Sequence, residues 1–232
     1  MSDQMTARAG SIEDVLPRLD VDLWGVAPVA GMADVRLRDQ VAALMPEARS
    51  VVALAMEIFP EVLDHSRPDK VMGEASLRDM LVPHMDFLNG RLTKAAYDLA
   101  RLCHRQGFKA LPMPAANSPS DQRYLAGVLS YKHVAEAAGL GTIGRHSLLV
   151  TPEFGPRVRL ACLVTEAELK PTHRAQEGIC DGCNECIVAC PANALGLPEG
   201  GEAYSINKYA CNVFRGAAGP CSECMRVCPQ GR

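Results

Sequence analysis

Eight of the ten cysteines of this chain lie in its last quarter, and their spacing is the first feature that points to chemistry. Four of them form a C-x2-C-x2-C-x3-C-P run from Cys180 to Pro191. A second group follows with its first member set apart, as Cys211 and then a C-x2-C-x3-C-P run from Cys221 to Pro229. Thiolates at these spacings are typical ligands of iron–sulfur clusters, which transfer single electrons.

The first run is the one found in two-cluster ferredoxins, in which the fourth cysteine binds the neighbouring cluster. That crossover predicts two [4Fe–4S] clusters, each held by four thiolates. The first set is Cys180, Cys183, Cys186 and Cys228, and the second set is Cys190, Cys211, Cys221 and Cys224. Two alternatives are disfavoured. Disulfides do not suit a reducing compartment, and structural zinc sites usually show two separated C-x2-C pairs.

Length and composition limit the class of protein. The chain has 232 residues, of which 48% are hydrophobic and 22% charged, as in ordinary globular proteins. A net charge of −3 offers no attraction for a phosphate backbone, so we do not expect a nucleic-acid partner. No apolar run approaches the roughly 18 residues of a membrane span, and neither a signal peptide nor a twin-arginine pair is seen. We therefore expect a cytoplasmic protein without a membrane partner.

The uneven distribution of cysteines predicts a domain boundary near residue 170. In residues 1–170, strand-length apolar runs at 51–56, 108–113 and 157–165 alternate with helical patterns at 85–103 and 129–138, which predicts an α/β (α+β) domain. Residues 171–232 contain too few large apolar residues to build a core unaided. We therefore expect metal to hold this second, ferredoxin-like domain together.

A glycine-rich segment from Gly139 to Gly144 matches the pattern G-x-G-x-x-G. A dinucleotide-binding fingerprint has a strand before it and a helix after it. Here a predicted helix precedes the glycines, and the strand-like residues 147–150 follow them. The glycines therefore predict either a tight helix-to-strand turn or a close approach of the backbone to a flat ligand.

The residues around these glycines resemble the region before the clusters in epoxyqueuosine reductases and reductive dehalogenases. The resemblance is carried by residues 132–133, 138–145, 148–149, 152–155, 157–160 and 165, and more weakly by 46–52. It implies a nitroreductase-like domain that holds cobalamin, whose cobalt receives electrons from the two clusters. The implied cofactor-binding residues are Lys132, Gly139, Leu140, Gly141, Thr142, Gly144, Arg145, His146 and Ser147. A nitroreductase-like scaffold also accommodates a flavin, which stays open as an alternative.

The chain departs from the epoxyqueuosine reductase pattern at the position of the general acid. In an ungapped alignment this acid falls on Leu125, and the proline and glutamate of the same pattern fall on Val128 and Tyr131. Queuosine chemistry is therefore not expected, and a specific dehalogenase activity is no better supported. The remaining candidates for a catalytic proton donor precede the glycines, and each of them could equally be a solvated turn or helix-surface residue. They are Asp121, Tyr124, Tyr131 and His133.

These observations predict an iron–sulfur oxidoreductase, corrinoid-dependent by resemblance, that reduces a small-molecule substrate. Its expected electron donor is a low-potential protein such as ferredoxin or flavodoxin. Two other functions stay open: a ferredoxin-like carrier that delivers electrons to a corrinoid protein or another partner, and a flavin-binding reductase. A homodimer also stays open.

Overall fold

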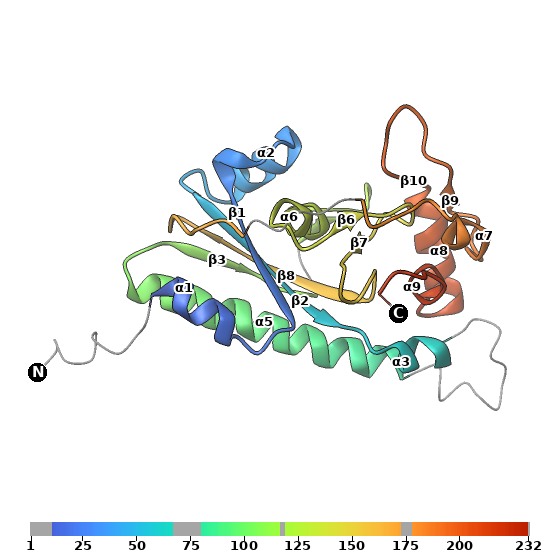
Figure 1. Cartoon of the computed structure of the whole chain (residues 1–232), viewed down its shortest axis with the longest axis horizontal. Helices are drawn as coiled ribbons and strands as arrows, with labels where there is room; N and C mark the ends of the chain where they lie inside the picture. The colour runs from blue at the N-terminus through green and yellow to red at the C-terminus, as the bar shows by residue number, and fades with distance from the viewer. Residues whose placement is uncertain (1–10, 67–79, 117–118, 173–177, 232) are drawn as a thin grey trace, which may run out of the picture.

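A four-stranded antiparallel sheet forms the centre of the computed structural model, which describes residues 11–66, 80–116, 119–172 and 178–231. The strands run in the order β1-β2-β8-β3, and Figure 1 shows helices on both sides of them. Their bounds are β1 Leu23–Pro28, β2 Ser50–Glu57, β8 Val158–Thr165 and β3 Ala110–Met113. β2 and β8 pair along their whole length, from Ser50 opposite Thr165 to Glu57 opposite Val158.

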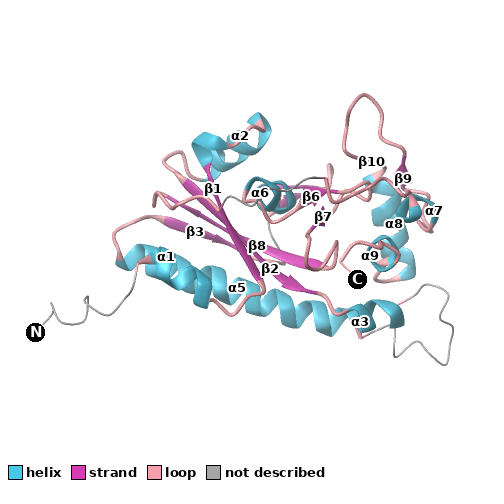
Figure 2. Cartoon of the chain, viewed as in Figure 1, coloured by secondary structure: helices cyan, strands magenta, loops and turns pink. Residues whose placement is uncertain are grey.

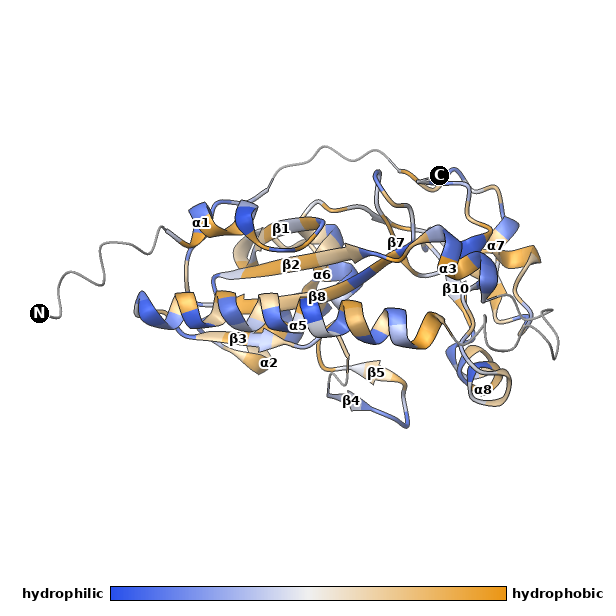
Figure 3. Cartoon of the chain, turned by 90° about the horizontal axis from the view of Figure 1, so that it is seen from below, coloured by the Kyte–Doolittle hydropathy of each residue, from blue (hydrophilic) through white to orange (hydrophobic). Residues whose placement is uncertain are grey.

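The three predicted strands and the mixed α/β class of the first region are confirmed. β2 reads as a continuous apolar run because helices cover both faces of the sheet, so its side chains are buried on either side. Figure 3 shows this hydrophobic strand beside α5 (Leu81–Arg105), whose hydrophilic and hydrophobic residues alternate along the helix. β1 and α2 (Val35–Leu44) were not predicted, since neither carries a long apolar pattern.

One face of the sheet is covered by α5, together with α1 (Ile12–Val15), as Figure 2 shows. α5 buries the stripe that includes Leu88, Leu92 and Leu99 against the sheet. The helix begins before Pro83, because a proline in the first turn of a helix costs no hydrogen bond. Although α5 is long, it carries many charges, and none of the helices described here is long and apolar enough to cross a membrane.

The other face is covered by α2 and α6 (Tyr131–Ala137). The predicted helix at 129–138 is therefore present in a slightly shorter form. The strand-like residues 147–150 form β7 (Leu149–Val150), which pairs with β6 (Thr142–Ile143). A second hairpin, β4 (Ser120–Asp121) with β5 (Ala126–Gly127), projects from the body of the molecule in Figure 3.

The described residues 178–231, here called the cysteine region, lie beyond one end of the sheet (Figure 1). Their only buried hydrophobic residues are Cys186, Ala194 and Cys228. The region contacts the remainder of the chain at several places, one of which joins α3 (Pro60–His65) to α9 (Glu223–Arg226). Its elements are α7 Glu185–Val188, β9 Leu195–Gly196, β10 Ser205–Ile206, α8 Lys208–Ala218 and α9 Glu223–Arg226. Two short 3-10 helices, Leu16–Arg18 and Val29–Gly31, complete the described structure.

The described residues 11–172 are here called the core region. Thr172 still belongs to it, because its hydroxyl donates to the Ala138 carbonyl oxygen at 2.8 Å and accepts from the Val26 N–H at 2.9 Å. Cys103 and Cys162, the two cysteines outside the C-terminal group, are fully buried in the core region. They serve there as small apolar side chains.

Candidate functional site

The eight C-terminal cysteines line two neighbouring cavities. The smaller cavity is lined by Cys180, Cys183, Cys186 and Cys228. The larger cavity, of about 430 Å³, is lined by Cys190, Cys211, Cys221 and Cys224. The fold thus gathers at each cavity the four cysteines that the ferredoxin crossover assigns to one cluster.

Local backbone geometry turns the first three cysteines toward one space. Gly182 and Asn184 adopt left-handed conformations on either side of Cys183, with φ values of 80° and 67°. The Cys183 N–H donates to the Asp181 carboxylate at 3.0 Å, and α7 begins directly afterwards and carries Cys186. A loop bent in this way lets closely spaced thiolates surround a single metal cluster.

Cys228 reaches the first set from the far end of the cysteine region, and the core region fixes it there. The buried Arg157 guanidinium donates to the Gly231 carbonyl oxygen, and Gly155 and Gly231 lie back to back with no room for a Cβ on either. A Cβ on Gly155 would lie 2.0 Å from the Gln230 carbonyl oxygen. The segment that follows Cys228 is therefore pressed against the loop before β8.

The thiols of each set influence one another's protonation. Burial raises the pKa of Cys186 to about 11, and the neighbouring thiols of Cys180, Cys228 and Cys183 add to this rise. Burial likewise raises the pKa of Cys224 to about 12, with contributions from Cys221 and Cys211. Thiols in this state bind protons near neutral pH unless a metal displaces them. Eight thiols arranged in two such groups are a donor set that fits two [4Fe–4S] clusters.

Within the described part of the chain, no three His, Cys, Asp or Glu side chains form a group that could hold a single metal ion. The thiols of each set are instead spread around the wall of a cavity.

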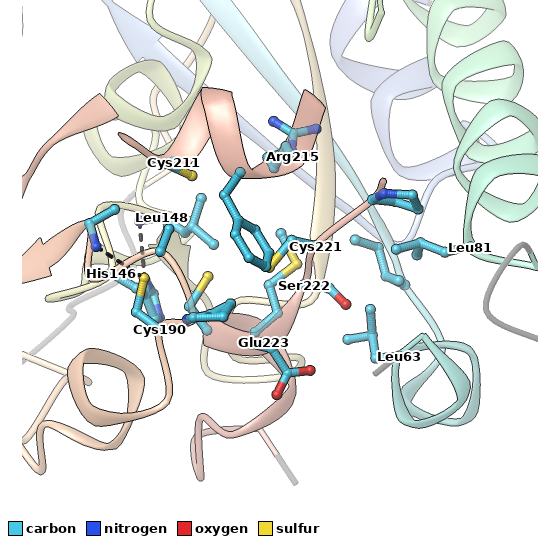
Figure 4. A pocket seen from close by; sticks show the side chains of 18 of the residues that line it. Leu63, Leu81, His146, Leu148, Cys190, Cys211, Arg215, Cys221, Ser222 and Glu223 are labelled. Atoms are coloured by element: carbon cyan, nitrogen blue, oxygen red, sulfur yellow. Dashed lines mark hydrogen bonds between the residues drawn. The ribbon is translucent and has the colours of Figure 1, made fainter. Parts of the chain in front are cut away.

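The larger cavity extends from the second set of cysteines into the core region, as Figure 4 shows. Its far wall is apolar and comes from α3, α5 and the residues after β2, including Leu63, Leu81 and Met85. Arg159 of β8 also lines it, and its guanidinium donates to Asn89 Oδ1 at 2.8 Å and to the Ala115 carbonyl oxygen at 3.1 Å. A cavity of this size, with apolar walls and a few fixed polar groups, is typical of a site for an organic molecule.

The glycines of the predicted cofactor segment do not line the large cavity. Gly139, with φ 76°, ends α6, and the Leu140 N–H reaches back to the Ala135 carbonyl oxygen at 2.9 Å. A Cβ on Gly141 would lie 2.1 Å from the Val150 carbonyl oxygen, so this glycine permits the close pairing of β6 and β7. The sequence left a tight turn and a ligand contact open, and the geometry favours the turn.

The other predicted cofactor residues have different places. Leu140 is fully buried, and the Thr142 hydroxyl accepts from the Ile179 N–H at 3.3 Å. The Lys132 ammonium donates to the Ser147 carbonyl oxygen at 2.7 Å and to the Tyr204 hydroxyl at 3.1 Å. Lys132 therefore connects the core region to the cysteine region, and it does not line the large cavity.

Arg145 lines the smaller cavity. Its guanidinium donates to the Gly182 carbonyl oxygen at 2.7 Å and to the side chain of Asn184. His146 and Ser147 do line the large cavity, together with Leu148. The His146 ring is buried, and burial, followed by the charge of Lys132, lowers its pKa to about 4. Of the predicted cofactor residues, His146 and Ser147 are thus those that face the large cavity.

The four predicted proton donors do not line the large cavity either. Asp121 pairs with Arg123 on the exposed β4–β5 hairpin, and this pairing lowers the pKa of its carboxyl group. Tyr124 is exposed at the same hairpin. The Tyr131 hydroxyl donates to the Pro114 carbonyl oxygen at 2.9 Å, whereas His133 bonds Ser130 and faces a separate cavity beside α2. Their catalytic roles stay predictions that this geometry does not favour.

Sequence reasoning missed several polar residues of the large cavity, which lie on α5 and β8 outside any motif. They are Asp86, Asn89, Arg159 and, from α8, Arg215. Helical spacing places Asp86 and Asn89 on one face of α5, but no pattern in the sequence distinguishes that face from an ordinary solvated one.

Comparison with known proteins assigns the cysteine region. Residues 179–232 match the family described as 4Fe-4S dicluster domain. Two similar proteins are enzymes: the tetrachloroethene reductive dehalogenase of Desulfitobacterium hafniense, 36% identical over 115 residues, and the epoxyqueuosine reductase of Listeria monocytogenes, 35% identical over 119 residues. The matches cover 41% and 46% of this chain, but only 21% and 31% of those proteins. Each match thus spans less than a third of the relative's own length.

Solved structures share the fold over nearly the whole chain. A reductive dehalogenase whose structure suggests a mechanism for B12-dependent dehalogenation matches with a TM-score of 0.67 at 20% identity, covering 95% of this chain and 31% of that one. An epoxyqueuosine reductase solved with a tRNA stem loop matches with a TM-score of 0.59 at 21% identity, covering 98% and 65%. The sequence matches, the shared fold and the two sets of cysteines together show that this chain is related to the reductive dehalogenases and epoxyqueuosine reductases and carries a 4Fe-4S dicluster domain.

Proposed function

We propose that this chain acts as an iron–sulfur reductase, in which two [4Fe–4S] clusters serve a cobalamin held against the large cavity. One observation carries the proposal: the second set of cysteines and the core region line the same cavity of about 430 Å³. Ligand pockets commonly measure about 300–1,000 Å³. When bound, the clusters supply single electrons and cobalamin supplies the reductive bond cleavage.

The second cluster would fill the end of this cavity at its four cysteines, so the apolar end is where part of an organic cofactor would contact the chain. Leu63, Leu81 and Met85 would exclude water from the apolar part of such a molecule. Arg159 and Asn89 are already oriented by their mutual hydrogen bond, so polar groups are available without further ordering. One structural neighbour is described as carrying out B12-dependent dehalogenation, which supports cobalamin rather than flavin as the cofactor to test. The nitroreductase-like character of the core region belongs to the same proposal.

The two sets of cysteines differ in access from solvent. Cys183 is exposed, whereas the second set opens into the cavity between the two regions. We infer that an external electron donor, such as ferredoxin or flavodoxin, docks near the first set. A carrier function is less favoured because the similar proteins are reductases.

The nature of the substrate is open between a small molecule and a larger partner. The relatives act on different substrates, and one neighbour was solved with a tRNA stem loop. The net charge of −3 argues against a nucleic-acid partner, but the solved neighbour makes a tRNA stem loop one of the ligands to test.

Anaerobic reconstitution tests the proposal. We expect about eight iron and eight sulfide per chain, as two [4Fe–4S] clusters require. Added cobalamin should bind at micromolar concentration and change to a base-off absorption spectrum. Met85→Trp should fill the cavity and abolish this binding at unchanged iron content, whereas Tyr97→Trp, on an exposed turn of the same helix, should leave it intact.

Three results would contradict the proposal. If the protein holds zinc in place of iron, it has no iron–sulfur clusters. If cobalamin binds equally well to Met85→Trp and to the unaltered protein, the cofactor is bound elsewhere. If neither cobalamin nor flavin binds but the reduced clusters pass electrons to a corrinoid protein, the chain is a carrier. If cobalamin binds as proposed, competition between a tRNA stem loop and halogenated aromatic compounds for the cobalamin-loaded protein separates the two substrate classes.

A further inference from the structure

One side chain borders both groups of thiols. Among the residues that the structure describes, His146 is the residue that lines both the cavity of the first set and the cavity of the second. It is 3% exposed, and Figure 4 places it with Cys190 at the end of the large cavity opposite Leu81. The imidazole is therefore within reach of a cluster held at either set.

The ring is held in one orientation by its own backbone. The Leu148 N–H donates to His146 Nδ1 at 3.1 Å. A nitrogen that accepts a hydrogen bond carries no proton, so the proton of the ring is on Nε2. Within the described residues, His146 Nε2 has no hydrogen-bond partner, although the side chain is buried. Part of the surface of Nε2 is open to the cavities that His146 lines, so its N–H can reach an acceptor bound there.

The turn that carries His146 is fixed from both sides. The Gly144 N–H donates to the Leu148 carbonyl oxygen at 2.9 Å, and the Ser147 N–H donates to the Gly144 carbonyl oxygen at 2.8 Å. Lys132 binds the Ser147 carbonyl oxygen from α6. A Cβ on Gly144 would lie 2.9 Å from His146 Cε1, so the missing side chain makes room for the ring.

We propose that His146 is a positioning residue of the cluster pair, whose Nε2–H donates a hydrogen bond to a sulfur atom of one of the two clusters. The inference rests on the two clusters of the proposed function. A hydrogen bond to sulfur stabilises the more negative, reduced cluster and so raises its reduction potential. His146 thereby contributes to the difference in potential between the two clusters.

Two substitutions distinguish the two nitrogens of the ring. In His146→Asn the amide oxygen can still accept from Leu148, but no donor replaces Nε2–H. In His146→Gln the longer side chain can return a donor to the position of Nε2. We expect the Asn variant to lower the reduced-to-oxidised ratio of one cluster about tenfold at fixed potential, a shift of about 59 mV for one electron. The Gln variant should stay near the value of the unaltered protein.

Redox titration followed by electron paramagnetic resonance provides the measurement. His65→Asn, on the exposed end of α3, is the matched control and should change neither potential. Unchanged potentials in His146→Asn, or an equal fall in both His146 variants, would refute the role of Nε2–H. A chain that bound no iron would refute the proposed function instead.

A second measurement needs no variant. Protein labelled with 15N-histidine and partly reduced should show a hyperfine coupling between a cluster and one imidazole nitrogen. The loss of that coupling in His146→Asn, but not in His65→Asn, would assign it. If the unaltered protein shows no coupled histidine nitrogen, His146 makes no hydrogen bond to a cluster.

Discussion

The core region and the cysteine region are stabilised in different ways. Residues 11–172 contain two hydrophobic clusters, one on each face of the sheet, whose members include fully buried strand residues such as Val52 and Val51. In residues 178–231 the only buried hydrophobic side chains are Cys186, Ala194 and Cys228, and α8 buries none of its residues. The first region can fold by burying apolar surface, whereas the second depends on what its thiols bind.

This contrast explains why the cavity lies where the two regions meet. A rigid sheet and a long helix provide one wall, and loops that require metal provide the other. Loss of the clusters should therefore unfold the cysteine region and leave the core region folded.

The largest effect is expected from a cluster ligand. Cys183→Ser should lower the iron content from about eight to about four per chain, because one [4Fe–4S] cluster loses a thiolate. The cysteine region should become sensitive to protease while the core region stays protected, since metal binding is coupled to the folding of such loops. Iron analysis and limited proteolysis under anaerobic conditions measure both changes.

Cys103→Ala is the matched control for this experiment, because Cys103 is buried on α5 far from the two sets. It should keep the full iron content. An unchanged iron content in Cys183→Ser would show that the first set does not hold a cluster.

A substitution in the hydrophobic core should destabilise the core region and leave the iron content unchanged. Leu99 is fully buried on α5, so Leu99→Ala should lower the free energy of unfolding of the core region by about 2–5 kcal/mol. Tyr97→Ala, at an exposed position of the same helix, should change it by no more than about 0.5 kcal/mol. Denaturant unfolding followed by circular dichroism gives the difference.

Iron content should be the same in the Leu99→Ala and Tyr97→Ala proteins while they are folded. Loss of iron at the same denaturant concentration at which the core region unfolds would show that the two regions unfold as one unit.

The smallest expected change is in the free energy of unfolding when either of two glycines is replaced by alanine. Gly141→Ala places a Cβ 2.1 Å from the Val150 carbonyl oxygen, and such overpacking typically costs about 1–3 kcal/mol. Gly90→Ala, on α5 with open space around it, should instead stabilise the chain by about 0.4–1 kcal/mol. Thermal unfolding of both variants gives the sign. A neutral Gly141→Ala would indicate that β6 and β7 separate easily, which would restore the glycine segment as a candidate ligand surface.

Much of the core region could be predicted from sequence. The apolar runs at β2 and β8 and the stripe of α5 bury enough residues to be visible as patterns. β1 was missed because it is short and contains Gly25 and Pro28, and its pairing with β2 is a tertiary contact. The antiparallel order of the sheet also had no local signal.

The candidate site was predictable only in part. The spacing of the cysteines indicated which thiols act together, but it did not place them beside α3 and α5. The glycines had two interpretations, and the proton donors were chosen by their position in the chain, which says little about which side chains share a cavity.

The sequence by itself determined the two groups of thiols, because cluster ligands are close neighbours in short loops and their spacing is a local property. Tertiary structure alone decided which residues complete the large cavity, since Leu63, Asn89 and Arg159 come from three separate elements. It also decided that His146 lines the cavities of both groups, because that position depends on how a turn of the core region packs against loops that follow it in the chain.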